Sequence, residues 1–98
     1  MVKHMIIWKL KEEFKDKESK KKEIKDSLEG LVGKIPGLIE MHIHYNPIEG
    51  SAGDVFMDSL FENFDALATY QKHFLHIEVA NNVVRPAVEQ RLSFDYEV

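Results

Sequence analysis

The sequence predicts an α+β fold in which one four-stranded antiparallel sheet is covered by helices on one face. Two observations support this class. Four segments carry alternating or mixed apolar residues that fit β-strands, and two longer stretches between them carry apolar residues at helical spacing. At 98 residues the chain is long enough for one hydrophobic core and too short for two, so we expect a single domain over residues 1–98.

Residues 2–10, 38–46, 55–62 and 91–98 are the predicted strands. The first of them has apolar residues on both faces, which is typical of a sheet that is covered on both sides. In the last strand the side chains alternate strictly between apolar and polar. We expect its apolar set to point inward and its polar set outward: Leu92, Phe94, Tyr96 and Val98 against Arg91, Ser93, Asp95 and Glu97.

The first predicted helix begins in a charged stretch, residues 11–26, and continues into an apolar series at offsets of 4, 7, 8 and 11. Lysines and acidic residues alternate along the charged stretch, which favours a solvated helix face over a phosphate-binding patch. Glycine and proline then end the helix. The apolar series is Ile24, Leu28, Leu31, Val32 and Ile35, and the helix exit is Gly33, Pro36 and Gly37.

A second helical region follows the third strand, and Asn63 or Asp65 can cap its start. A further helix is predicted from Leu75 to Val88, with Pro86 breaking or kinking its last turn. The apolar residues expected on one face of the first of these helices are Ala66, Leu67, Tyr70 and Phe74.

Composition and charge exclude several classes of function. The formal charge of −4, from 13 basic and 17 acidic residues, argues against general binding of nucleic acid or of anionic membranes. Cysteine is absent, which excludes disulfides and thiolate chemistry. No segment resembles an export signal or a membrane span, so we expect a cytoplasmic protein. The glycine-containing loop at residues 46–54 lacks the Gly-Lys-Ser/Thr ending that cradles phosphates, and we expect no cofactor.

The order of the predicted elements is β-α-β-β-α-β, which is the split βαβ arrangement of ferredoxin-like folds. The helices of such a fold cover only one face of the sheet. The other face is also partly apolar and needs a cover that a short chain finds most simply on a second copy of itself. The sequence therefore predicts a homodimer.

Several short strings of residues occur in an order that matches one known family, although none of them is specific alone. They are Val2-Lys3-His4 with Trp8-Lys9, Lys34-Ile35-Pro36-Gly37-Leu38, Phe61-Glu62 running into Ala66-Leu67-x-x-Tyr70-x-x-His73-x-x-His76, and Phe94-Asp95-Tyr96. In the identity and order of these strings the whole chain resembles the stress-responsive dimeric A/B barrel (Dabb) family. The resemblance implies a homodimer whose two sheets pack into a dimeric α+β barrel with the helices outside.

The resemblance also implies a site. Plant polyketide cyclases of this family close a linear polyketide by intramolecular aldol condensation with a histidine and a tyrosine. At the matching positions His76 is the base, Tyr70 is its partner and His4 lines the cavity. The chain departs from the cyclase pattern at Phe74, where proline is common, and at Val55, where the cyclase has a histidine; both departures argue against an identical reaction.

Residue chemistry supports the same pair, because an imidazole accepts a proton near neutral pH and a phenol can hydrogen-bond to an enolate. The expected substrate-binding residues are His4, His73, Phe74 and Trp8. A histidine metal site needs three or four convergent ligands, which the sequence does not establish. Some plant members of the family hold magnesium on backbone carbonyls at the exit of the first helix, and the resemblance transfers this site to Val32, Ile35 and Leu38.

We therefore interpret the chain as a dimeric barrel protein that binds a small hydrophobic or carbonyl-bearing molecule, with His/Tyr proton transfer of the cyclase, lyase or isomerase kind. The alternative is a non-catalytic stress-response or structural dimer, in which the histidines and Tyr70 are hydrogen-bonded core residues. A haem-degrading or quinol-forming monooxygenase, which shares this architecture, ranks third.

Overall fold

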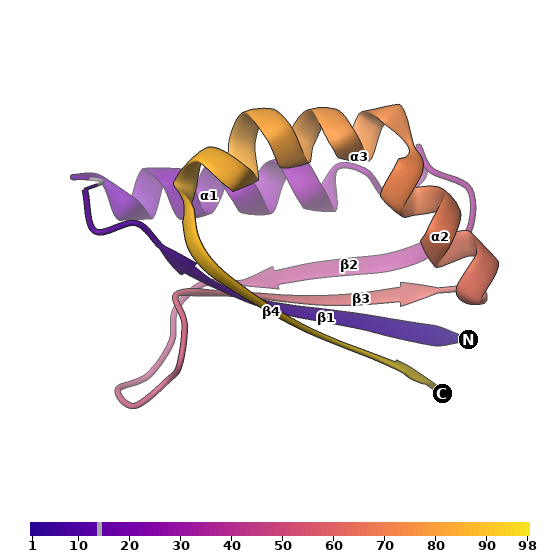
Figure 1. Cartoon of the computed structure of the whole chain (residues 1–98), viewed down its shortest axis with the longest axis horizontal. Helices are drawn as coiled ribbons and strands as arrows, with labels where there is room; N and C mark the ends of the chain where they lie inside the picture. The colour runs from indigo at the N-terminus through magenta and orange to yellow at the C-terminus, as the bar shows by residue number, and fades with distance from the viewer. Residues whose placement is uncertain (14) are drawn as a thin grey trace.

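The computed structural model describes residues 1–13 and 15–98. Four strands form one antiparallel sheet in the order β2-β3-β1-β4, and the helices lie together on one of its faces (Figure 1). This is the predicted ferredoxin-like α+β arrangement. The elements are β1 (Val2–Leu10), α1 (Lys17–Glu29), β2 (Leu38–His44), β3 (Val55–Phe61), α2 (Phe64–Lys72), α3 (Phe74–Val79) and β4 (Val88–Glu97).

Helix α1 is shorter than the sequence pattern predicted. Asp16 caps its start by accepting a hydrogen bond from the Ser19 amide at 3.0 Å, and the helix ends at Glu29. The predicted continuation to residue 35 is wrong, because the chain turns after Gly30 and passes through positive φ at Gly33. Leu31 and Ile35 still reach the core from this turn, whereas Val32 is 40% exposed.

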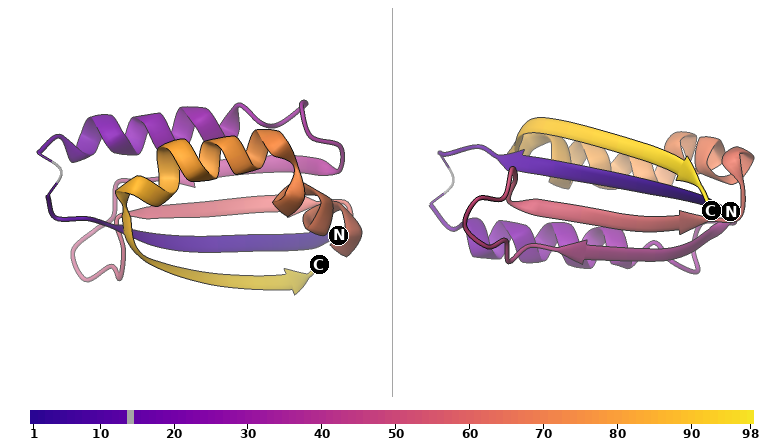
Figure 2. Two further views of the ribbon diagram at one scale, coloured as in Figure 1. Left: turned by 45° about the horizontal axis from the view of Figure 1, so that its top comes forward. Right: turned by 90° about the horizontal axis from the view of Figure 1, so that it is seen from below.

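Asn63 is the cap of α2, since its side chain accepts a hydrogen bond from the Ala66 amide at 2.8 Å. Helices α2 and α3 are separated by His73, whose backbone is extended. That break rotates the following residue out of the helical face, so the expected alignment of Phe74 with Tyr70 is wrong and Phe74 is 68% exposed. After α3 the chain continues through a π-helical turn, η1 (Ala80–Val84), and a 3₁₀ turn, η2 (Arg85–Ala87), into β4 (Figure 2). Pro86 lies in the 3₁₀ turn, which agrees with the prediction that it would break or kink the last turn of the helix.

The hydrophobic core lies between the helices and one face of the sheet. Strand β1 runs between β3 and β4, and all five residues that it directs toward the helices are buried, as alternation predicted. These five are Val2, His4, Ile6, Trp8 and Leu10. None of the helices in the described ranges is long and apolar enough to cross a membrane.

The two faces of β4 are opposite to those expected. In the antiparallel register Asp95 pairs with His4 and Ser93 pairs with Ile6, and paired residues point to the same side of a sheet. The polar set of β4 therefore faces the helices. Its apolar set points away from them, with Leu92 54% exposed and Phe94 69% exposed. Alternation separates two faces of a strand but does not say which face meets the helices.

The sheet face without helices, called here the open face, carries apolar side chains from several strands. The chain therefore has two partly apolar sheet faces, as the sequence predicted. The open-face residues are Met5 and Ile7 of β1, Phe56 and Leu60 of β3, and Leu92, Phe94 and Tyr96 of β4.

Candidate functional site

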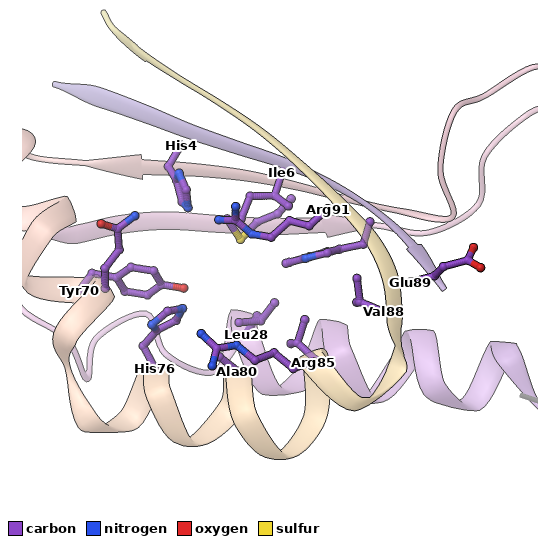
Figure 3. Close-up of a pocket in the computed structure, with 14 residues that line it drawn as sticks. His4, Ile6, Leu28, Tyr70, His76, Ala80, Arg85, Val88, Glu89 and Arg91 are labelled. Carbon is purple, nitrogen blue, oxygen red and sulfur yellow. The ribbon is translucent and has the colours of Figure 1, made fainter. Parts of the chain in front are cut away.

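A cavity of about 520 Å³ lies between the helix-covered face of the sheet and the chain that runs from α2 to β4 (Figure 3). One part of its wall is apolar, with Ile6 and Trp8 from β1, Leu28 from α1 and Met57 from β3. Strands β1 and β4 and helices α2 and α3 bring polar side chains to the same space. The cavity therefore combines an apolar wall with convergent polar groups, which is typical of small-molecule sites.

Tyr70 and His76 lie ring against ring in this cavity. Their ring centroids are 4.2 Å apart and the ring planes are inclined at 38°. Tyr70 is on α2 and His76 is on α3, and the extended backbone of His73 between the helices turns the chain so that both side chains face the sheet. Phe61 packs against the other side of Tyr70, with ring centroids 4.9 Å apart.

Burial raises the pKa of the Tyr70 phenol well above its usual range, while the positive charge of Arg91 opposes that shift. The hydroxyl therefore stays protonated at every physiological pH. It makes no hydrogen bond to any other described residue, and Figure 3 shows it pointing into the cavity. Tyr70 is thus a hydrogen-bond donor that is available to a molecule in the cavity.

Burial lowers the pKa of His76 below its usual value of 6.5. The backbone of Gln71 opposes this shift, and electrostatic interactions with His4, Arg85 and Arg91 add to it. The imidazole is therefore neutral at pH 7. Its Nδ1 atom is buried, and the described chain offers it no hydrogen-bond partner. Because nearly all buried polar atoms in proteins are hydrogen-bonded, this atom is an exception.

The cavity contains a second histidine, His4 on β1, and its ring is fixed by Asp95. The Nδ1 atom of His4 pairs with a carboxylate oxygen of Asp95 on the neighbouring strand. When Nδ1–H donates to the carboxylate, the neutral ring has Nε2 as its acceptor. Asp95 was expected to point outward, so its role was missed; the correct assignment of the two faces of β4 would have revealed it.

Four further polar side chains that line the cavity were also missed: Gln71, Arg85, Glu89 and Arg91. Arg91 shares the polar face of β4 with Asp95, so the correct assignment of the two faces of that strand would have revealed Arg91 as well. Arg85 lies where the π-helical turn gives way to the 3₁₀ turn, and helical periodicity does not predict side-chain direction there.

Four of the predicted site residues come together in the cavity: Tyr70, His76, His4 and Trp8. The other two predicted substrate-binding residues, His73 and Phe74, are not among the residues that line it. His73 caps α3, with its Nδ1 atom accepting a hydrogen bond from the Leu75 amide at 3.1 Å. The ring of His73 stacks on Phe74, which lies on the surface.

The carbonyls expected to hold magnesium lie after α1. The Ile35 carbonyl already accepts a hydrogen bond from the Leu38 amide at 3.3 Å. The segment from Gly30 to Ile39 contains Lys34 and no carboxylate, and magnesium sites in proteins usually include one or two carboxylates. This donor set fits magnesium poorly. Within residues 1–13 and 15–98, no three His, Asp or Glu side chains are grouped so that they could hold a metal ion.

Comparison with solved structures gives close matches of the whole fold. A dimeric protein of unknown function with a ferredoxin-like fold from Bacteroides fragilis is 26% identical to this chain, with a TM-score of 0.88, over 99% of this chain and 95% of that one. A Dabb family protein from Mesorhizobium loti is 20% identical, with a TM-score of 0.78, over 99% and 95% of the two chains.

A third similar structure, a putative antibiotic biosynthesis monooxygenase from Nitrosomonas europaea, is 13% identical, with a TM-score of 0.75, over 100% of this chain and 98% of that one. At this identity the likeness concerns the fold alone. No protein of curated function matches the sequence. The sequence model of the family described as Stress responsive A/B Barrel Domain matches residues 2–98. The sheet order and the similar solved structures agree with this match. The chain therefore belongs to the stress-responsive A/B barrel (Dabb) family.

Proposed function

We propose that the protein is a homodimer that binds a small hydrophobic or carbonyl-bearing molecule in the cavity and transfers a proton at His76. The observation that carries this proposal is the contact between the rings of His76 and Tyr70 in the cavity, with centroids 4.2 Å apart, where the Tyr70 hydroxyl makes no hydrogen bond to the described chain. A structural histidine in a core normally has both a packing role and a hydrogen-bond partner. The Nδ1 atom of His76 has no such partner by hydrogen-bond geometry within the described chain.

The proposed step is removal of a proton from a carbon next to a carbonyl group. Neutral His76 accepts the proton as the C–H bond breaks, and the electron pair moves onto the carbonyl oxygen to give an enolate. Tyr70 donates a hydrogen bond to that oxygen, where negative charge develops. The low pKa of His76 and the high pKa of Tyr70 keep each group in the protonation state that this step requires. No metal ion takes part in the step.

The walls of the cavity support an apolar ligand. Ile6, Trp8, Leu28 and Met57 present hydrocarbon and indole surface, and the polar groups are concentrated near α2, α3 and β4. Such a surface binds the apolar part of a ligand by excluding water, while the few polar groups fix its orientation. A carbonyl compound with an aromatic or aliphatic substituent matches both parts.

The open face supports dimerisation. Its exposed Leu92, Phe94 and Tyr96 lie on an edge strand and continue an apolar surface from β1 and β3. An apolar patch of this kind is a normal interaction surface and an aggregation hazard if left uncovered. The relative from Bacteroides fragilis is dimeric, which favours the same use of the fold here.

The catalytic proposal is tested by deuterium exchange at the α-carbon of 1-phenyl-2-propanone in D₂O, followed by NMR. We expect the protein to accelerate the exchange and expect His76→Gln and Tyr70→Phe each to reduce the acceleration on the order of a hundredfold. Tyr45→Phe is the matched control, because Tyr45 is partly buried outside the cavity. Wild-type exchange no faster than in buffer would favour the non-catalytic dimer, and unchanged rates in both variants would exclude the two residues from the reaction.

A further inference from the structure

Arginine is used sparingly and in one place in this chain. Of the 13 basic residues, 11 are lysines and only 2 are arginines, Arg85 and Arg91. Both arginines line the cavity, and none of the lysines does. Several lysines instead form ion pairs with acidic residues, such as Lys22 with Asp26 at 2.9 Å. The distinction matters because the guanidinium group is planar and always charged, and binds a carboxylate with two parallel hydrogen bonds, which an ammonium group does not.

The two arginines reach the cavity from different elements. Arg85 begins η2 and Arg91 lies on β4. Figure 3 shows both guanidinium groups extending toward the part of the cavity where the Tyr70 hydroxyl and the His76 imidazole lie. Their charges act on the pair: Arg91 opposes the rise in the Tyr70 pKa, and both arginines contribute to the lowered pKa of His76.

Neither arginine has an acidic partner among the described residues. Arg85 donates a hydrogen bond to the neutral amide oxygen of Asn81 at 2.7 Å. Arg91 makes no hydrogen bond or ion pair with any other residue in the described chain. Glu89 is the one acidic residue that lines the cavity among the described residues, and it lies at the opposite end, 4.0 Å from the ammonium group of Lys9 (Figure 3).

We infer that the cavity takes a substrate that carries a carboxylate group, which Arg85 and Arg91 bind beside His76 and Tyr70. The inference rests on the proposed function and narrows the substrate class to small apolar carboxylic acids. The carboxylate is the anionic partner of the two guanidinium groups, and the apolar remainder of the molecule lies against the wall that includes Ile6 and Trp8. Binding one end of the substrate in this way orients the carbon that reacts.

The test compares two probes of nearly identical shape, 2-naphthoate and its neutral analogue 2-naphthamide, by NMR titration of the whole protein. We expect naphthoate to bind about tenfold more tightly, since hydrogen bonds between charged groups are worth about one factor of ten or more. Arg85→Gln with Arg91→Gln is expected to abolish this preference. The control variant, Lys22→Gln with Lys34→Gln, also removes two positive charges, but from exposed positions outside the cavity. We expect it to keep the preference for naphthoate.

Each outcome separates the inference from the proposed function. Equal affinity of the wild type for the two probes overturns the carboxylate assignment and leaves the cavity as a binding site, provided that both probes shift the Tyr70 and His76 signals. A preference that survives in the double arginine variant also overturns it. Failure of both probes to bind contradicts the proposed function together with the inference. If the double variant unfolds, Arg91→Gln alone is measured instead, and we expect it to reduce the preference for naphthoate over naphthamide.

Discussion

The imidazole of His76 lies 4.2 Å from the phenol ring of Tyr70, centroid to centroid, and burial moves the pKa values of the two groups in opposite directions. Burial disfavours the charged form of each group, so a histidine loses its proton more easily and a tyrosine holds its proton more firmly. One cavity therefore holds a neutral acceptor and a protonated donor at the same pH.

The lowered pKa of His76 predicts a pH effect on stability. Since the folded-state pKa lies below the usual value of 6.5, neutral His76 contributes stability above pH 6.5, and this contribution is lost as the pH falls through the folded-state pKa. We expect the free energy of unfolding of the wild type to fall more than that of His76→Gln between pH 7 and about pH 5. Urea denaturation at both pH values measures the difference, and equal losses in the two proteins would contradict it.

Tyr70→Phe is expected to keep the fold. The hydroxyl has no partner in the described chain, so its removal costs less than about 1 kcal/mol, whereas Tyr70→Ala, which leaves a cavity among buried rings, costs about 3–5 kcal/mol. Urea denaturation of both variants checks this ordering. A cost for Tyr70→Phe near that of Tyr70→Ala would mean that the hydroxyl is a structural hydrogen-bonding group rather than a ligand contact.

Asp95→Ala is expected to destabilise the protein by about 1 kcal/mol, because it removes the hydrogen-bond partner of buried His4. The cost is no larger because Asp95 itself is partly exposed to solvent. Glu97→Ala is the matched control, since Glu97 lies on the same face of β4 and is exposed. Thermal and urea unfolding of the two variants give the comparison. Equal stability of Asp95→Ala and Glu97→Ala would show that the pair does not hold His4.

Phe94→Asp is expected to convert the dimer to a monomer, because it places a charge in the apolar open face. Phe64→Asp is a close control: Phe64 is also 69% exposed, but it lies on α2 and away from that face. Sedimentation at micromolar concentration measures the masses. A monomeric wild type, or a dimeric Phe94→Asp variant, would count against the open face as the interface.

Much of the fold was predictable because local patterns determine it. The alternation along β1 separated its two faces, and Asn63 was one of the two residues predicted to cap the start of α2. The end of α1 was misjudged because Leu31 and Ile35 are buried at helical spacing although they lie in a turn. A periodic pattern records burial, and it does not distinguish a helix from a turn that happens to return to the core.

The candidate site was predictable only in part. Tyr70, His76 and His4 came from a resemblance to a family whose motifs the chain carries. Asp95 and Arg91 were missed because the apolar face of β4 was assumed to meet the helices, whereas it lies on the open face. Apolar residues on a strand of a dimer-forming fold can meet a partner instead of the chain's own core, and this depends on tertiary structure rather than on sequence pattern.

The most direct test of the account is the pH dependence of α-carbon deuterium exchange in 1-phenyl-2-propanone, measured beside the NMR titration of His76. We predict that the rate is constant above neutral pH and falls as the pH decreases through the pKa of His76, at a value below 6.5, and that His76→Gln lacks this fall. A rate that does not change while His76 titrates, or a His76 pKa above 6.5, would contradict the claim that neutral His76 is the base.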